Sequence, residues 1–326
     1  MSLSETLPSV VYIAGAGRSG STLLDTLLGN HPLAFGAGEL AGVFNDWAHG
    51  QRCTCGQSYP ECELWGKVIE RLRVTFPQLE PAEAERITRR IEAVSNPFRP
   101  TRNAQTRDQE QYAELWRATL QALGQVSGKR LVIDSSKNSR PSWWRIWALS
   151  ELCGVSVNVV HLVRDPRALM WSALRGSNRL LEEGKRQTFR GGVSRALIGW
   201  SLANLSVHAN AGNVASLNLA RLRYEDFVAD PARELQTLGQ PLHLDMQPVL
   251  GLLTDQRPIE AGHGVGGNRM RRQGPIRIRA DEEWQQALPG YARLLAPLAW
   301  PLARLYGYNV WQLAGPSAPA THGGNV

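Results

Sequence analysis

The segment Gly15–Thr22 (Gly-Ala-Gly-Arg-Ser-Gly-Ser-Thr) combines three glycines, three hydroxyl side chains and one arginine. Glycines let a backbone approach a phosphate closely, and the free N–H groups and dipole at the start of a helix favour a bound anion. Ser21 and Thr22 add hydroxyl donors. The alternative is an ordinary strand-to-helix turn that Ser and Thr cap. The residue types and their spacing favour a phosphate-binding loop.

The same segment differs at one position from the loop that binds nucleoside triphosphates, Gly-x-x-x-x-Gly-Lys-[Ser/Thr]. Gly15 and Gly20 have the spacing of that motif, but Ser21 stands where it requires Lys. A kinase with this loop would lack its main cation for the terminal phosphate. The apolar run Leu131–Asp134 could serve as a Walker-B-like strand, so a P-loop nucleotide or small-molecule kinase stays open as the alternative enzyme.

A second group of polar residues follows the apolar run Val159–Val163. Asp165 is placed to cap a helix and Pro166 to occupy its first position. These structural roles do not involve Arg164, which places a cation at the carboxyl end of a strand.

Two further charged residues could take part in chemistry. Glu39, in Gly36–Leu40, offers a carboxylate that could act as a general base, and Lys137 follows the run Leu131–Asp134. The alternatives are a helix-capping Glu39 and a solvated Lys137. We expect His161 to be a core histidine, since apolar strand residues flank it, and His31 to be a helix-terminus residue.

These groups need a framework of strands that alternate with helices. Continuous apolar runs predict buried parallel strands, whereas apolar residues at helical spacing predict helices. The predicted strands cover Ser9–Ala14, Arg130–Asp134, Val155–Val163 and Ser216–Tyr224. The predicted helices cover Gly20–Leu28, Leu64–Phe76, Pro81–Val94, Asp108–Val126, Trp143–Leu152, Pro166–Leu174 and Val193–Ala211. Alternation of this kind indicates a P-loop-like, three-layer α/β/α fold with a central parallel sheet, whose ligands bind at the carboxyl ends of the strands.

The two groups of residues together resemble the sulfotransferases that use 3′-phosphoadenosine 5′-phosphosulfate (PAPS). Residues 17–24 (Gly-Arg-Ser-Gly-Ser-Thr-Leu-Leu) resemble the family's 5′-phosphosulfate loop, and more closely its bacterial and tyrosylprotein branch, in which Arg replaces Lys. The resemblance implies that Gly17, Ser19 and Gly20 bind the nucleotide with Arg18, Ser21 and Thr22, and that Arg18 contacts the transferring sulfuryl group.

The resemblance extends to the other candidate residues. In this family an arginine at the position of Arg164 and a serine eight residues later bind the nucleotide's 3′-phosphate, and the resemblance implies this role for Arg164 and Ser172, which would face the site after two helical turns. The tyrosylprotein branch places its catalytic glutamate at the spacing of Glu39 from Arg18, and Lys137 matches a lysine that stabilises the transition state. Residues 263–269 resemble the C-terminal loop that closes over the 3′-phosphate, with Asn268 and Arg269 as candidates.

The resemblance implies an enzyme that moves a sulfuryl group from PAPS to an acceptor hydroxyl by in-line displacement and needs no metal. A nucleotide-binding protein that has lost catalysis is the non-enzymatic alternative. We expect a single domain over residues 1–312, with a helical insertion at about 51–128, and a disordered tail over 313–326. The class of the acceptor and the oligomeric state, homo-oligomer included, stay open.

Composition is consistent with a globular protein that binds an anion. The chain has 326 residues, a net charge of +7 and 43% hydrophobic residues. Its basic residues are scattered, which favours a small anionic ligand over nucleic acid. No secretory signal pattern or membrane-spanning run is evident, so we expect a cytoplasmic protein.

Three of the four cysteines lie close together as Cys53, Cys55 and Cys62, while Cys153 is remote. Three readings are open: a metal site with His49 as a fourth ligand, a redox-active or disulfide-bonded pair, and ordinary loop structure. Three clustered cysteines fall short of a complete zinc set, and we expect no metal.

Overall fold

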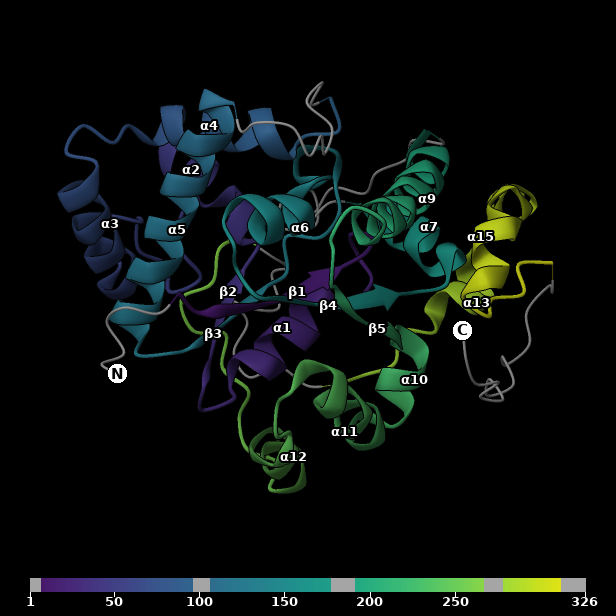
Figure 1. Ribbon diagram of the computed structural model, residues 1–326. Helices are drawn as coiled ribbons and strands as arrows, with labels where there is room; N and C mark the ends of the chain where they lie inside the picture. The colour runs from purple at the N-terminus through teal and green to yellow at the C-terminus, as the bar shows by residue number, and fades with distance from the viewer. Residues whose placement is uncertain (1–6, 96–105, 177–190, 267–277, 312–326) are drawn as a thin grey trace.

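The fold is built on a five-stranded sheet in a computed structural model that describes residues 7–95, 106–176, 191–266 and 278–311 (Figure 1). Neighbouring strands are hydrogen-bonded in the order β2-β3-β1-β4-β5. The strands are β1 (Ser9–Ala14), β2 (Ala34–Gly38), β3 (Leu131–Asp134), β4 (Val157–Val163) and β5 (Asn218–Arg223). Every pairing is parallel, so all five strands end at the same edge of the sheet.

Helices cover both faces of the sheet, as apolar side chains on alternate strand positions require. On one face, Val11 and Ile13 of β1 pack in a core with α1 (Ser21–Gly29), α11 (Pro231–Leu242) and α12 (Gln247–Thr254). On the other face, Val10 and Tyr12 share a core with the helices α2 to α6, which lie between Val43 and Trp147. The structure thus has the three-layer α/β/α architecture that the alternation of strands and helices predicts.

Helix α7 (Pro166–Arg175) begins where its capping residue and proline predict. Asp165 accepts a hydrogen bond from the N–H of Arg167 and caps this helix, which has Pro166 at its start. The α-helices up to the fifth strand are α1 (Ser21–Gly29), α2 (Val43–Ala48), α3 (Glu63–Thr75), α4 (Pro81–Glu92), α5 (Arg107–Ser127), α6 (Arg145–Trp147), α7 (Pro166–Arg175) and α9 (Gly191–Ala211). Those that follow it are α10 (Tyr224–Ala229), α11 (Pro231–Leu242), α12 (Gln247–Thr254), α13 (Glu283–Ala287), α14 (Gly290–Leu295) and α15 (Trp300–Leu305).

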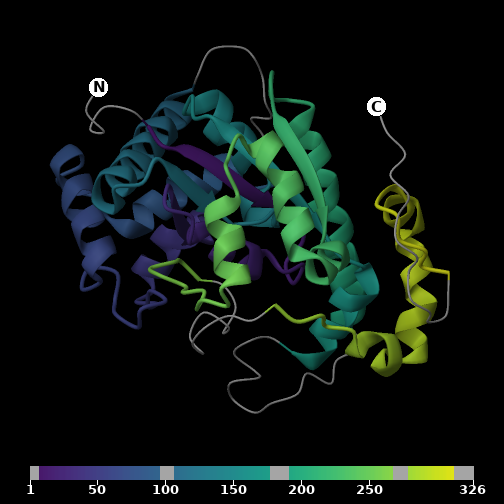
Figure 2. The ribbon, with the colours of Figure 1, turned by 90° about the horizontal axis from the view of Figure 1, so that it is seen from below.

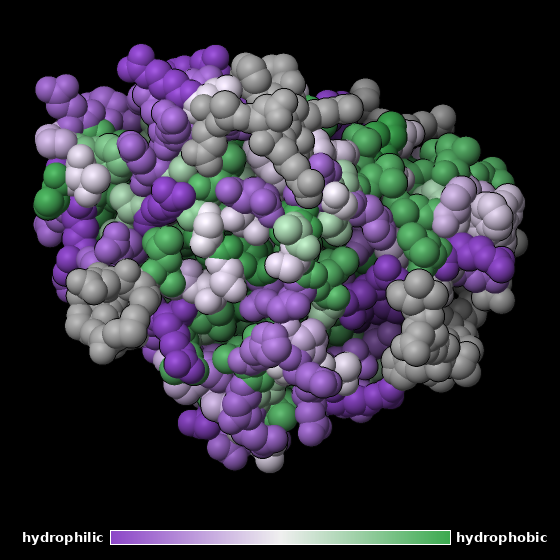
Figure 3. Space-filling model, in the orientation of Figure 1, coloured by the Kyte–Doolittle hydropathy of each residue, from purple (hydrophilic) through white to green (hydrophobic). Residues whose placement is uncertain are grey.

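The two ends of the sheet carry different helices. In Figure 2, α3–α5 (blue) lie at one end, and the C-terminal helices α13–α15 (yellow) lie at the other, beside α7. Exposed apolar side chains gather near these C-terminal helices and α9 (green in Figure 3), among them Ile198, Leu298 and Leu305. Among the described residues, no helix is long and apolar enough to cross a bilayer.

Most predicted elements agree with the structure to within a few residues, but β2 was not predicted. Its sequence, Ala-Phe-Gly-Ala-Gly, is poor in the β-branched residues that favour strands. The strand exists because β3 pairs with it, and Gly29 is needed where the end of α1 passes the strand: a Cβ at Gly29 would lie 2.7 Å from the Gly36 Cα. The expected C-terminal tail lies outside the described residues.

Candidate active site

The candidate residues lie in the segments that follow the strands at one edge of the sheet. Glu39 follows β2, Lys137 follows β3, the glycine-rich loop follows β1, and Arg164 follows β4. Neighbouring strands are spaced by about 4.8 Å, so these segments extend over roughly 14 Å from β2 to β4. That length suits an extended ligand with several charged groups.

Two glycines give the loop after β1 its shape. Gly15 has a φ of 121°, and a Cβ there would lie 2.3 Å from the carbonyl oxygen of Leu162 on β4. Gly20 has a φ of 93°, and a Cβ there would lie 2.5 Å from the ring of Tyr224. Positive φ combined with such close approach excludes other residues. The loop is therefore held tightly against β4 and the start of α10.

Within the part of the chain that the structure describes, the loop holds one buried hydroxyl without a partner, next to a helix N-terminus that has no side-chain cap. Helix α1 begins at Ser21, and its N-cap, Gly20, has no side chain to satisfy the first N–H groups. The Ser19 hydroxyl is buried, and no partner for it occurs within the described residues. Buried polar atoms normally have partners, so an unpaired hydroxyl beside an uncapped helix terminus fits an anionic ligand.

Arg18 connects the loop to α7. Its guanidinium group donates to the Ser172 hydroxyl at 3.4 Å and to the Gly176 carbonyl at 3.1 Å. Arg18 also has a φ of 70°, which is uncommon outside glycine. The structure thus brings together Arg18 and Ser172, which belong to two motifs far apart in the sequence.

Arg164 lies beside the same loop in a nearly closed environment. It donates to the Arg18 carbonyl at 3.0 Å, and its guanidinium carbon lies 4.2 Å from the centre of the Tyr224 ring. The Arg164 side chain also pairs with Asp281 at 3.1 Å, and Asp281 pairs with Arg175 at 2.9 Å. The Nε of Arg164 is buried without a partner among the described residues. The Asp281 carboxylate therefore contacts Arg164, the arginine that we expect to bind a phosphate.

Glu39 and Lys137 form an ion pair at the other end of the edge. The Lys137 ammonium group lies 2.5 Å from the Glu39 carboxylate, and the two side chains are 13% and 40% exposed. Lys137 has a φ of 63°, and its carbonyl accepts hydrogen bonds from Tyr12 and Ser142. Because the lysine backbone is fixed from two sides, the ammonium group is presented to the carboxylate in a defined position, while Glu39 stays accessible to a second molecule.

A buried ion-pair network supports the segment that carries Lys137. Arg145 contacts Asp134, the last residue of β3, at 2.7 Å and also pairs with Glu92 on α4. All three side chains are fully buried. Burial raises the pKa of Glu92 to about 7, although the Arg145 charge acts against this shift. Asp134 in turn accepts the N–H of Ser136, so the network orients the chain just before Lys137.

Several of these residues were not predicted from the sequence. Arg145, Glu92, Tyr224 and Asp281 carry no spacing that points to the site, since their partners lie far away in the chain. Asn138 had a weak signal, next to Lys137: its side chain accepts the N–H of Gly15 at 3.3 Å.

The two histidines that we expected to be structural residues lie within the protein core. His161 is buried and pairs with Asn204 at 2.7 Å, and His31 is buried against the carbonyl of Asp245, which confirms both as structural residues. Asn268 and Arg269 lie outside the described residues.

Comparisons with known proteins agree with this fold. The "Sulfotransferase Domain from the Synechococcus PCC 7002 Olefin Synthase" has 22% sequence identity and a TM-score of 0.50, and the match covers 94% of this chain and 97% of that one. The "Sulfotransferase Domain from the Curacin Biosynthetic Pathway" has 18% identity and a TM-score of 0.49, with 92% and 99% covered. No curated protein matches the sequence.

A family model described as "Sulfotransferase family" matches residues 8–248. This range includes the glycine-rich loop, Glu39, Lys137, Arg164 and Ser172. It covers well over half of the chain, and the kinase alternative is not favoured. The chain belongs to the sulfotransferase family and transfers sulfuryl groups.

Proposed function

We propose that this enzyme takes the sulfuryl group of PAPS and passes it to an acceptor hydroxyl by in-line displacement. The observation that carries the proposal is a pair of buried polar atoms at one edge of the sheet, Ser19 Oγ and Arg164 Nε, for which the described residues supply no hydrogen-bond partner. They suit a nucleotide with phosphate groups at both its 5′ and 3′ positions. A nucleoside triphosphate would have no group for Arg164.

The glycine-rich loop would hold the 5′ end. The backbone N–H groups at the start of α1, with the hydroxyls of Ser21 and Thr22, would bind the phosphate that becomes the leaving group. Arg18 would stabilise the charge that develops on the sulfuryl and bridging oxygens. Positioning and preorganised cations account for most of the acceleration in such transfers, as they do in phosphoryl transfer.

Arg164 and Ser172 would hold the 3′-phosphate. A guanidinium group can bind a phosphate through two parallel hydrogen bonds. Tyr224 and the loop backbone fix the Arg164 side chain from two sides, so it loses little conformational freedom on binding. The 3′-phosphate would replace the Asp281 carboxylate, which now pairs with Arg164.

Glu39 would take the proton of the acceptor hydroxyl. One of its carboxylate oxygens pairs with Lys137, and the side chain is 40% exposed. The second oxygen can accept the proton while the acceptor oxygen attacks sulfur. Lys137 would contribute positive charge next to the reacting atoms.

A thermal-shift comparison tests the donor. We expect 3′-phosphoadenosine 5′-phosphate (PAP) at one hundred times its Kd to add about 2.7 kcal/mol of stability, which raises Tm by several degrees. ATP with Mg²⁺ at the same concentration should give a smaller shift. A larger shift with ATP and Mg²⁺ would refute the donor assignment. Sulfate transfer from labelled PAPS to a panel of hydroxyl compounds then separates an enzyme from a protein that only binds the nucleotide.

A further inference from the structure

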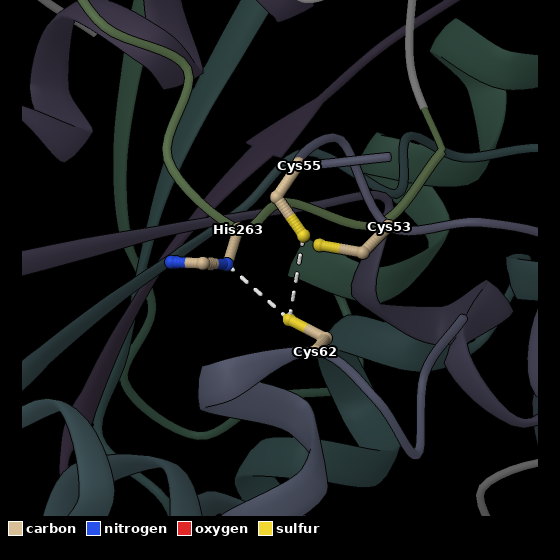
Figure 4. A group of neighbouring side chains, drawn as sticks. All are labelled: Cys53, Cys55, Cys62 and His263. Atoms are coloured by element: carbon tan, nitrogen blue, oxygen red, sulfur yellow. Dashed lines mark hydrogen bonds between the residues drawn. The ribbon is translucent and has the colours of Figure 1, made fainter. Parts of the chain in front are cut away.

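Four side chains with metal-binding atoms converge at a place that the proposed transfer reaction does not use. They are Cys53, Cys55 and Cys62, from the segment before α3, and His263, which lies 201 residues after Cys62 (Figure 4). One donor atom from each lies within 4.8 Å of all the others. Folding therefore completes a Cys₃His set that the sequence left one ligand short. His49, the candidate from sequence, is not in this group and contacts the Asn45 carbonyl of its own helix instead.

Two of the separations are close to those around a tetrahedral zinc ion. Zn–S bonds of about 2.3 Å and Zn–N bonds of about 2.0 Å place two sulfurs about 3.8 Å apart and a sulfur and a nitrogen about 3.5 Å apart. The Sγ atoms of Cys55 and Cys62 are 3.7 Å apart, and the Cys62 Sγ lies 3.2 Å from the His263 Nδ1. A disulfide would require an S–S separation of about 2.05 Å. All four cysteines are free.

Backbone hydrogen bonds of the protein hold the segment around the cluster in place. The Cys53 N–H donates to the Gln57 carbonyl at 2.9 Å, and the Gly56 N–H donates to the Cys53 carbonyl at 2.8 Å. Gly56 has a φ of 89°, which closes this tight turn. Cys62 is the N-cap of α3, a helix of 13 residues. The ligands are thus held by a turn and a helix terminus, a frame that lowers the conformational cost of binding an ion.

The backbone beside Cys62 suits a negatively charged sulfur. Because Cys62 precedes the first turn of α3, backbone N–H groups of Leu64 and Trp65 point at its sulfur and stabilise negative charge there. A bound Zn²⁺ would stabilise the thiolates directly.

The histidine segment is also tied to the cysteine segment. The Thr54 hydroxyl donates to the Gly262 carbonyl at 2.7 Å, and the Trp65 indole N–H donates to the His263 carbonyl at 2.7 Å. Two residues after His263, Val265 exchanges hydrogen bonds with the backbone of Ala37 and Glu39, each 2.8 Å long. An ion at the cluster would therefore fix the segment that lines the Glu39 backbone.

We propose that Cys53, Cys55, Cys62 and His263 bind one structural Zn²⁺, which joins the segment before α3 to the segment beside Glu39. All four positions are filled by protein, as in structural zinc sites, so the ion has no open position for substrate. Binding releases one proton from each thiol that is protonated beforehand. This site departs from our expectation of no metal, and it is independent of the sulfuryl donor.

Metal analysis of the full-length protein, purified without chelators, tests the site. We expect about one equivalent of zinc per chain in the wild type, and less than about 0.2 equivalents in Cys55→Ser and His263→Ala. Cys55 is exposed, so its replacement by serine should leave the fold intact. His49→Ala is the control: it removes an exposed histidine four residues before Cys53 in the sequence, and it should keep the zinc.

Two further measurements separate zinc from the other readings. Thiol titration of the unfolded protein, with chelator and without reductant, should give four free thiols, whereas a disulfide would leave two. Cobalt substitution should produce the visible absorption of tetrahedral thiolate-bound Co²⁺ in the wild type and in His49→Ala, but not in His263→Ala. Less than about 0.2 equivalents of zinc in the wild type, with no cobalt spectrum, would refute the site.

Discussion

Asp281 should weaken nucleotide binding, because it contacts the cation that we assign to the 3′-phosphate. Its carboxylate lies 3.1 Å from Arg164 and 2.9 Å from Arg175. The Arg164 side chain is 6% exposed and that of Asp281 is 29% exposed, so the pair is partly shielded from solvent. A phosphate that binds Arg164 must first displace this carboxylate.

The magnitude follows from the cost of breaking that pair. A hydrogen bond between charged groups contributes about 1.5–3 kcal/mol when shielded, and an exposed pair contributes about 0.2–1 kcal/mol. The partial exposure of Asp281 places this pair between these limits, at about 1–2 kcal/mol. Asp281→Asn keeps the size and the backbone contact to Arg164 but removes the charge. We therefore expect PAP to bind Asp281→Asn about 5–30-fold more tightly than the wild type.

Isothermal titration with two nucleotides isolates the effect. ADP lacks the 3′-phosphate, so its affinity should change by less than about 2-fold in Asp281→Asn. Arg164→Ala should weaken PAP binding by about 10–100-fold, and adding Asp281→Asn to it should bring no further gain, since the partner is gone. Equal gains for PAP and ADP would refute the competition. An unchanged PAP affinity in Arg164→Ala would refute the 3′-phosphate assignment itself.

Three other predictions concern catalysis and stability. Arg18→Ala and Glu39→Ala should each lower kcat by at least about 10²-fold with folding intact, and a Glu39→Ala enzyme with near-normal kcat on a verified acceptor would rule out the base assignment. Arg145→Leu should destabilise the protein by about 3–5 kcal/mol in urea unfolding, because it leaves two buried carboxylates without a cation; a loss below about 1 kcal/mol would contradict this reasoning. Burial lowers the pKa of His161 from 6.5 to about 4. The free energy of unfolding should therefore decrease as the pH falls from about 6.5 towards about 4, by up to about 1.4 kcal/mol per pH unit. Unfolding curves of His161→Gln, measured over the same pH range, should lack this slope.

The sequence predicts most of the sheet, because buried parallel strands leave continuous apolar runs and end in recognisable turns. The glycine-rich loop and the Arg164–Ser172 spacing are local patterns of this kind. The short helices after β5 were harder to predict from the sequence. Helix α10, for example, has six residues, which are too few to show a helical period. The β2 strand was missed since its stability comes from pairing with β3 rather than from its own residues.

The parts of the site that the sequence does not predict depend on contacts between distant segments. Arg145 in isolation reads as an ordinary surface arginine in a tryptophan-rich helix, yet it is fully buried between two carboxylates. His263 completes the cysteine cluster from the far side of the sequence, and Asp281 reaches Arg164 in the same way. Neither pairing leaves a spacing that can be read along the chain.

The strand order explains why the two phosphate motifs meet where they do. From β1 the chain passes over β3 to reach β2, whereas from β4 it continues outward to β5. The connections of β1 and β4 thus leave in opposite directions, and ligands of such sheets bind at the point where this happens. The glycine-rich loop follows β1 and Arg164 follows β4, so they lie on the two sides of this point. Glu39 and Lys137 lie on the β2–β3 side, so we expect the acceptor to enter there.

The segment that carries Cys53, Cys55 and Cys62 reaches the same side through its contacts with residues 262–265. Exchanging that segment with one from another family member should therefore change the choice of acceptor while leaving PAP affinity within about 2-fold. A large loss of PAP affinity in a folded exchange variant would contradict the assignment of nucleotide and acceptor to different parts of the sheet edge.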